Sequence, residues 1–227
     1  MTELKEKHYL NAIVGNKFAS KFIYSARLKI FKHLELLIDF NSLDNILDVG
    51  VCSVKDELST NFFELLFPNK SKIVAFSDQD ASWMENEFPG LKFVQGDGCN
   101  LPFESDSFDL VFSSAVIEHV GNFERQLAFL RECYRVSKKY VFLTTPNRFH
   151  PLEFHTSLPF IHWLPKSVHR KILSFLGFKD LSLEENMNLL DAKYLSLMCK
   201  SIPINSYTIY RNKFFLFTSN LLLFCKK

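Results

Sequence analysis

Three aspartates lie at the ends of apolar runs in this sequence, and their placement predicts a shared ligand site. Asp48 lies in the first run, just before the Gly50 that ends it. Asp78 follows the second run, and Asp97 follows the third, between two glycines. Such short apolar runs are typical of buried strands, and ligands of parallel sheets bind in the crevice outside the carboxyl ends of the strands. We therefore expect the three carboxylates to converge on one crevice.

A second group that could do chemistry is a set of histidines in an aromatic stretch of the chain: His150, His155, His162 and His169. No two of them have the i, i+4 spacing of a helical zinc pair, and no cysteine pair assists them, so the sequence predicts no metal site. Because imidazole titrates near neutral pH, His155 is our candidate catalytic base, with His150 as the alternative. Ordinary packing beneath a lid is the competing interpretation of each.

Strand and helix patterns alternate along most of the chain, which predicts an α/β fold with a Rossmann-like, doubly wound, mostly parallel sheet. Strands are expected at residues 46–49, 73–76, 91–94, 108–113 and 140–144. Helices are expected at residues 19–37, 54–66, 82–87, 123–134, 167–176 and 191–200, the fourth with Asn122 as its N-cap. Two closing strands at 207–210 and 216–225, with a turn near Asn212, add a C-terminal antiparallel hairpin.

Residues 147–178 interrupt this alternation directly after the fifth predicted strand. The stretch is rich in Phe, Trp and His, and its three prolines stiffen it. We expect an insertion that covers the crevice, with Asn147, Arg148 and His150 as substrate-binding candidates. Residues 1–227 are expected to form a single domain, in which residues 1–40 are an N-terminal helical segment.

The composition is that of an ordinary globular protein and argues against several classes. A net charge of +2 is too small to indicate a nucleic-acid partner. The 5 cysteines are odd in number and lack paired metal-type spacing, which favours reduced thiols in a cytoplasmic protein. No apolar run approaches the length of a membrane span. The aromatic and basic run 154–171 leaves a peripheral membrane contact open, although a helix capping the site is our preferred interpretation, and the oligomeric state is left open.

Three sequence blocks, in order, carry a resemblance to a known family. They are Ile-Leu-Asp-Val-Gly at 46–50, Gly-Asp-Gly with Leu-Pro-Phe at 96–103, and the run 107–120, which holds Phe-Asp-Leu-Val and Val-Ile-Glu-His-Val. With these blocks the chain resembles the class I S-adenosylmethionine-dependent methyltransferases. Pro-Asn-Arg at 146–148 is similar to a subgroup that acts on small molecules.

That resemblance implies S-adenosylmethionine as the cofactor and assigns roles to the strand-end residues. Gly50 has no Cβ and would allow close approach of the backbone, while Asp48 would face the methionine ammonium. Asp78 would accept the ribose hydroxyls, with Asp80 as the alternative. The other implied contacts are Asp97 to the adenine amino group, Gly98 as close backbone, and Ser113 and Ser114 on the sulfonium side.

One part of the pattern departs from the family. Glycines usually occupy alternate positions after the first-strand acid, whereas Cys52 and Val54 stand at the later sites here. Because a β-branched valine resists positive φ, the loop must follow a different path or the site is degenerate.

The resemblance implies a methyltransferase acting on a small-molecule, saccharide or lipid-linked acceptor. Glu118-His119, after the fourth strand, could contact the substrate, with local packing as the alternative. Two other functions stay open: a non-catalytic S-adenosylmethionine-binding module with a degenerate glycine loop, and a nucleotide-dependent oxidoreductase.

Overall fold

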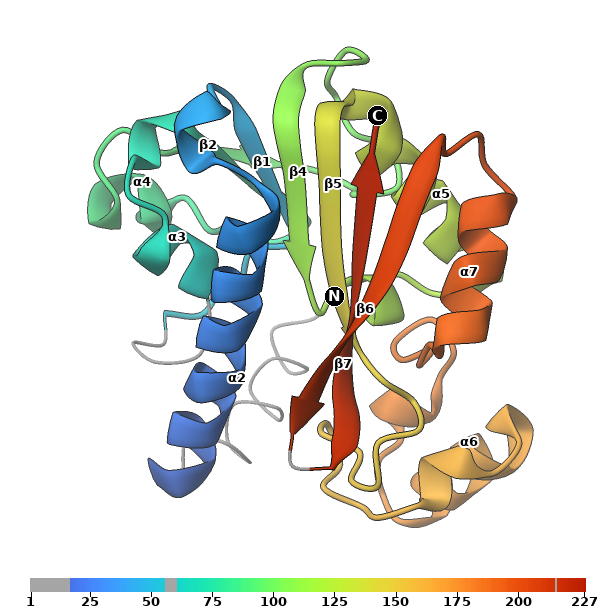
Figure 1. The fold of residues 1–227 in the computed structure, drawn as a ribbon. Helices are drawn as coiled ribbons and strands as arrows, with labels where there is room; N and C mark the ends of the chain where they lie inside the picture. The colour runs from blue at the N-terminus through green and yellow to red at the C-terminus, as the bar shows by residue number, and fades with distance from the viewer. Residues whose placement is uncertain (1–16, 56–60, 215) are drawn as a thin grey trace.

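The computed structural model describes residues 17–55, 61–214 and 216–227, which form one twisted sheet covered by helices on both faces (Figure 1). The seven strands follow the order β3-β2-β1-β4-β5-β7-β6. Strands β1 to β5 are parallel, and β7 pairs antiparallel with both β5 and β6. The predicted doubly wound, mostly parallel fold with a C-terminal antiparallel hairpin is confirmed. The strands are β1 (Ile46–Val49), β2 (Ile73–Ser77), β3 (Lys92–Gln95), β4 (Phe108–Ser114), β5 (Ser137–Pro146), β6 (Ser206–Phe214) and β7 (Phe217–Lys226).

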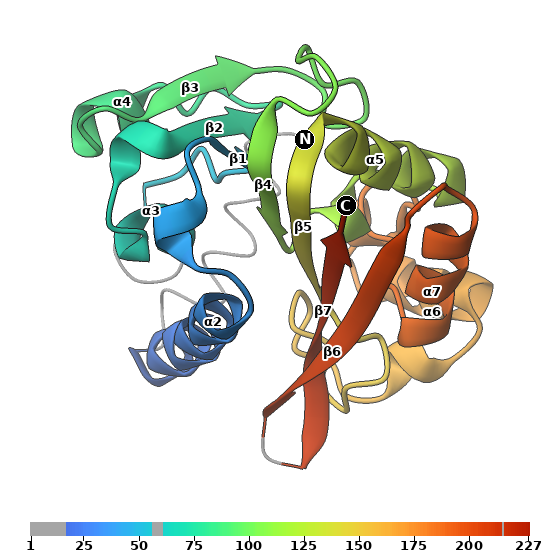
Figure 2. The ribbon, with the colours of Figure 1, turned by 45° about the horizontal axis from the view of Figure 1, so that its top comes forward.

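The helices divide between the two faces of the sheet. The α-helices are α2 (Lys17–Leu37), α3 (Phe62–Leu66), α4 (Trp83–Glu87), α5 (Phe123–Val136), α6 (Lys166–Phe175) and α7 (Ala192–Lys200). Short 3-10 helices lie at Phe40–Ser42, Lys70–Lys72, Ile117–His119, Ile161–Trp163 and Asp180–Ser182. Figure 2 shows β3 at one edge of the sheet and the hairpin of β6 and β7 at the other.

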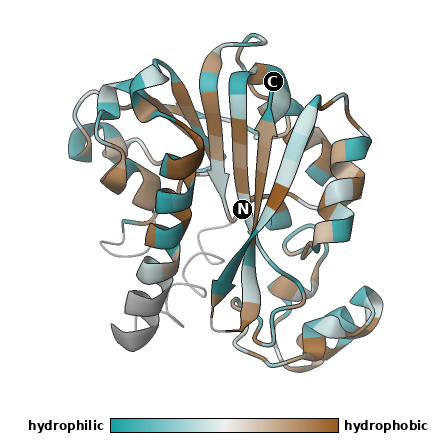
Figure 3. Ribbon diagram, in the orientation of Figure 1, coloured by the Kyte–Doolittle hydropathy of each residue, from teal (hydrophilic) through white to brown (hydrophobic). Residues whose placement is uncertain are grey.

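Two apolar cores result from the alternation of side chains along the strands, because successive residues of a strand point to opposite faces. Leu47 and Val111 pack with α5 and α7 on one face. Ile46 and Leu110 pack with α2, α3 and α4 on the other. The central strands are accordingly hydrophobic over most of their length (Figure 3). Burial on both faces holds β1 at the centre of the sheet and fixes where its carboxyl end lies.

The helix expected at 54–66 does not begin at Val54, and Asn61 interrupts it. Val54 is not helical, residues 56–60 lie outside the described residues, and α3 begins at Phe62. Asn61, just before it, has a left-handed backbone with φ 52°. Apolar spacing alone did not reveal this, because a left-handed residue interrupts a helix without changing the hydrophobic pattern.

The closing hairpin is longer than its sequence pattern. The turn expected near Asn212 lies slightly further along the chain: β6 continues to Phe214 through a register shift between Asn212 and Lys213, and β7 begins at Phe217. Strand β5 likewise begins at Ser137, ahead of its predicted start. Pairing with a neighbouring strand extends these strands through polar residues that carry no apolar signal.

Residues 147–178 leave the end of β5 and contain the 3-10 helix Ile161–Trp163 and helix α6. Figure 1 shows this segment at the end of the sheet where β5 finishes. Among the described residues, no helix is long and apolar enough to cross a membrane.

Candidate active site

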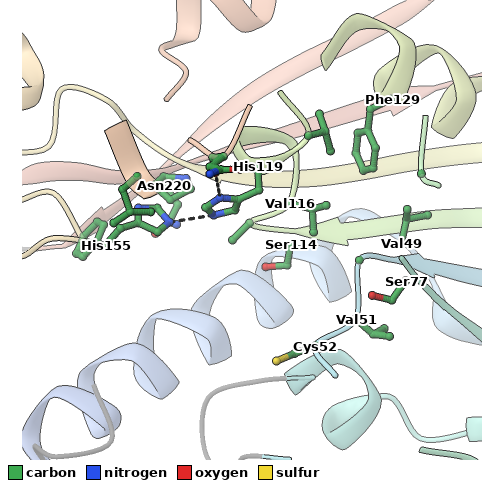
Figure 4. A pocket seen from close by; sticks show the side chains of 18 of the residues that line it. Val49, Val51, Cys52, Ser77, Ser114, Val116, His119, Phe129, His155 and Asn220 are labelled. Atoms are coloured by element: carbon green, nitrogen blue, oxygen red, sulfur yellow. Dashed lines mark hydrogen bonds between the residues drawn. The ribbon is translucent and has the colours of Figure 1, made fainter. Parts of the chain in front are cut away.

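A cavity of about 1550 Å³ opens at the carboxyl ends of β1, β2 and β4. Six predicted cofactor residues line it, and so does the predicted base His155. The six are Asp48, Gly50, Asp78, Asp97, Gly98 and Ser114. Figure 4 shows Ser114 and His155 among the side chains of the lining. Typical single-ligand pockets occupy roughly 300–1,000 Å³, so this cavity has room for two ligands at once.

Gly50 allows the chain to turn at the end of β1, where the side chain of Val116 lies close to the backbone. Its φ is +93°, a left-handed value that side chains disfavour, and a Cβ at this position would lie 2.2 Å from Val116 Cγ2. Glycine is therefore required here by its backbone conformation and by the space available.

The loop after Gly50 follows a path that does not need further glycines. Among the described residues, positive φ is found at neither Cys52 nor Val54. The side chain of Asn61 instead clamps Cys52, accepting from its N–H at 2.8 Å and donating to its carbonyl at 3.0 Å. Trp83 Nε1 donates to the Ser53 carbonyl at 2.8 Å. Side-chain bonds thus hold the loop where glycine conformations were expected.

Asp48 shares its buried position with a carboxyl that the sequence did not single out, Glu64 of α3. Asp48 is 5% exposed and Glu64 is fully buried. Burial raises the pKa of Asp48, and the nearby negative charge of Glu64 raises it further. Burial also raises the pKa of Glu64. The hydrogen bond with Asp48 opposes this second rise. A cation beside the two buried carboxyls would favour their ionised forms and be stabilised by them.

The end of β2 separates the two candidates for the ribose contact. Asp78 is exposed and lines the cavity, with its carbonyl accepting from Gln95 Nε2 at 3.0 Å. Asp80 accepts from the N–H of Ser82 at 2.9 Å, beside the start of α4, and is not among the described residues that line the cavity. The geometry favours Asp78.

Asp97 is bound by a partner from α5 that the sequence did not reveal. Arg125 donates to both of its carboxylate oxygens, at 2.9 and 3.1 Å, and the N–H of Cys99 donates at 2.9 Å. Burial alone would raise the pKa of Asp97, but these hydrogen bonds lower it, so the carboxylate is ionised at neutral pH. At Gly98, an added Cβ would lie 2.8 Å from Phe129 Cε2, which explains the need for glycine beside Asp97.

The two serines at the end of β4 differ in position. Ser113 is buried and donates to the Val49 carbonyl at 2.6 Å, so it ties β4 to β1. Among the described residues, it is not part of the cavity lining. Ser114 lines the cavity and bonds to the Thr144 hydroxyl at 2.9 Å. Adjacent residues of a strand face opposite sides, so only one of the pair reaches the site.

The three predicted substrate-binding residues lie outside the described lining of the cavity. Asn147 Nδ2 donates to the Thr218 carbonyl at 3.0 Å. Arg148 donates to the carbonyls of residues 162 and 164, and His150 Nδ1 bonds the residue 152 carbonyl at 2.9 Å. Arg148 and His150 brace the 147–178 segment internally, and Asn147 ties it to β7, so the placement favours a structural role for all three.

Among the four histidines of that segment, His155 is the one that lines the cavity. Its Nδ1 lies 2.6 Å from Glu153 Oε1, and its Nε2 lies 3.1 Å from Nε2 of His119. Nδ1 of His119 in turn lies 2.8 Å from the Asn186 carbonyl. Figure 4 shows the two imidazoles facing each other at one end of the cavity. Glu153 was not expected from the sequence, although its position two residues before the candidate base could have suggested it.

Charges around this histidine pair shift several pKa values. Burial alone would raise the pKa of Glu153, but the positive charge and hydrogen bonds of His155 lower it to about 2. Burial alone would lower the pKa of His155, but Glu153 raises it. Burial raises the pKa of the adjacent Glu118 to about 7. Thr145 donates to Glu118 Oε2 at 2.9 Å.

Comparison with known proteins gives this geometry a family context. Residues 47–143 match a family model described as "Methyltransferase domain", and this segment contains all the strand-end acids. A search of curated proteins found no significant match.

Solved structures share the fold at low sequence identity. One is a methyltransferase from Thermotoga maritima, described as S-adenosylmethionine-dependent and a possible histamine N-methyltransferase; the TM-score is 0.61 and the identity 14%, over 97% of this chain and 99% of that one. Another, an S-adenosylmethionine-dependent methyltransferase from Aquifex aeolicus, gives 0.53 and 14%, over 91% and 97%. Human N-acetylserotonin methyltransferase in complex with S-adenosylmethionine gives 0.54 and 12%, over 92% and 51%. These similarities concern the fold.

Proposed function

We propose that this chain, a class I S-adenosylmethionine-dependent methyltransferase, transfers a methyl group to a small-molecule acceptor bound beside His119 and His155. The observation that carries the proposal is that a single cavity is lined by all three strand-end acids and also by His119 and His155. The matched segment 47–143 supplies the acids and His119, and the segment after β5 supplies His155.

The residues present fit the cofactor, S-adenosylmethionine, by the chemistry of their donors. Its ammonium and sulfonium are cationic, and the buried carboxyls of Asp48 and Glu64 would stabilise positive charge at the end of β1. Asp78 would accept the ribose hydroxyls. Asp97 would share its carboxylate between Arg125 and the adenine amino group. When bound, the cofactor supplies an activated methyl group.

The chain's own contribution would be to orient the two reactants and exclude water. Gly50 and the Asn61 clamp fix the loop over the end of β1. The acceptor end of the cavity has an apolar wall that includes Leu152, Phe154 and Phe178. An acceptor with an apolar body and a polar reactive group suits this combination.

The two alternative functions lose support from specific features. A dinucleotide-binding oxidoreductase would carry a glycine-rich turn after β1, whereas Gly50 is followed by Val51-Cys52-Ser53-Val54. A degenerate, non-catalytic module would have a poorly held loop, whereas Asn61 and Trp83 hold this one by hydrogen bonds.

Calorimetric titration of the purified protein with S-adenosylmethionine and with its demethylated product tests the cofactor. Small molecules retained by the protein, identified by mass spectrometry, would then be offered with labelled cofactor to detect methyl transfer. Saturable binding with turnover is expected. Absence of binding at millimolar cofactor would overturn the proposal, and binding without turnover of any retained or offered acceptor would favour the non-catalytic module.

A further inference from the structure

Three side chains at the acceptor end of the cavity bring metal-ligating atoms together. Glu118 and His119 belong to the 3-10 helix after β4, and His155 comes from the segment after β5. One ligand atom from each residue lies within 4.8 Å of the others. We propose that Glu118, His119 and His155 bind a divalent transition-metal ion.

The hydrogen bonds of the two imidazoles determine where their protons lie. Nδ1 of His119 faces the Asn186 carbonyl, which can only accept, so this nitrogen carries a proton. Nδ1 of His155 faces the carboxylate of Glu153 and must also donate. In neutral imidazoles both Nε2 atoms are then unprotonated, and their lone pairs point at each other across 3.1 Å. Two such lone pairs are held together by a cation between them, which is either a proton on His155 or a metal ion.

Glu118 supplies the third ligand atom. Its side chain is fully buried, and Oε2 accepts from the Thr145 hydroxyl at 2.9 Å. Within the described residues, Oε1 has no hydrogen-bond partner and lies 4.0 Å from Nε2 of His119. A buried carboxylate oxygen without a hydrogen bond is costly, and an ion shared with the two imidazoles would satisfy it.

The atoms around the ligands also match a metal site. Ligating histidines commonly donate their other N–H to a carboxylate or a backbone carbonyl, and ligating carboxylates are themselves hydrogen-bonded. Glu153, the Asn186 carbonyl and the Thr145 hydroxyl occupy these three positions. Tetrahedral zinc holds its ligand nitrogens about 3.3 Å apart, close to the 3.1 Å observed.

Two imidazoles and one carboxylate favour zinc or another late first-row ion over magnesium, which prefers oxygen ligands. The sequence patterns predicted no metal site, because they detect ligands only at fixed spacings within one segment. These ligands combine adjacent residues with a histidine 36 positions further along the chain. In this arrangement His155 is a ligand rather than the free base that the sequence suggested.

Both histidines line the cavity, so an open coordination position would face the acceptor. This step rests on the proposed function: an acceptor with an oxygen donor, such as a hydroxyl, would bind the ion directly. The binding experiment below requires no cofactor and no acceptor, so its outcome is independent of methyl transfer.

The test is calorimetric titration of chelator-treated protein with Zn²⁺, with Co²⁺ absorption as a second readout of coordination. We expect one Zn²⁺ per chain and at least about a 100-fold loss of affinity in both His119→Ala and His155→Ala. Glu118→Gln keeps the volume and the Thr145 contact, and should weaken binding about tenfold or more. Glu153→Gln should weaken binding about 10–100-fold through the orientation of His155, as other outer partners of ligands do.

His33→Ala serves as the matched control, because His33 lies on α2 against Tyr210, outside the cluster. Circular dichroism would confirm that each variant is folded. Absence of stoichiometric Zn²⁺ and Co²⁺ binding by the folded wild type would overturn the proposal and leave a shared proton between the imidazoles. Equal affinity in wild type and in folded His119→Ala and His155→Ala would overturn it as well.

Discussion

Replacing Gly50 by alanine should destabilise the protein through two separable effects. At φ +93° an alanine is in the left-handed region, which costs about 1–2 kcal/mol. Its Cβ would also lie 2.2 Å from Val116 Cγ2 and 2.7 Å from Cγ1, and overpacking of this kind costs about 1–3 kcal/mol. The expected loss in the free energy of unfolding is therefore about 2–5 kcal/mol.

Two further variants separate the two effects. Gly177 has nearly the same φ, +90°, and nothing lies within 4 Å of its added Cβ, so Gly177→Ala should show only the backbone cost of about 1–2 kcal/mol. Val116→Ala removes both clashing methyl groups and leaves Val116 Cβ at 3.0 Å. In that background, Gly50→Ala should cost about 1–3 kcal/mol less than in the wild type.

Urea denaturation of the four Gly50/Val116 combinations, with Gly177→Ala alongside, measures these free energies. Equal costs of Gly50→Ala in both backgrounds would show that Val116 is not what excludes a side chain at position 50. A Gly50→Ala cost no larger than that of Gly177→Ala would show that packing adds nothing to the glycine requirement.

Three other predictions follow from the site and its support. Asp78→Asn should weaken S-adenosylmethionine binding by about 1–3 kcal/mol, while Asp80→Asn should leave it near wild type; calorimetry giving the reverse order would move the ribose contact to Asp80. Asn61→Gly keeps a left-handed backbone accessible but removes both bonds to Cys52, so it should lower cofactor affinity and stability by about 1–3 kcal/mol; wild-type values in titration and denaturation would mean that the clamp is dispensable. Asp109 accepts from the Asp44 N–H and pairs with Lys139; burial alone would raise its pKa, but these partners lower it. Its contribution is therefore present above the unfolded pKa of about 3.9 and lost as the pH falls through the lower folded value. The stability gap between wild type and Asp109→Asn should be full at neutral pH and shrink in acid, and a pH-independent gap would contradict this assignment.

The fold was largely predictable from the sequence, because its signals are local. A strand buried on both faces reads as an apolar run wherever it occurs, and β1 to β4 were found this way within a few residues. The Asn122 cap of α5 is confirmed by its bond to the Arg125 N–H at 3.1 Å. The ends of β5, β6 and α3 were missed because strand pairing and a left-handed residue set them.

The sequence also determined which strand-end residues reach one cavity. Asp48, Asp78 and Asp97 converge because parallel strands end at the same edge of a sheet, a rule that requires only strand order. It could not separate Ser113 from Ser114, since a shift of one residue along a strand exchanges the buried and the open face.

Only the tertiary structure decided the partners of these residues. Arg125 bonds Asp97 from 28 residues away, and His119 meets His155 from 36 residues away. In the segment after β5, Arg148 donates to two backbone carbonyls of the same segment and does not belong to the cavity lining among the described residues. Such contacts depend on how distant segments pack, and the periodicity and spacing of a chain constrain neighbours along the sequence rather than neighbours in space.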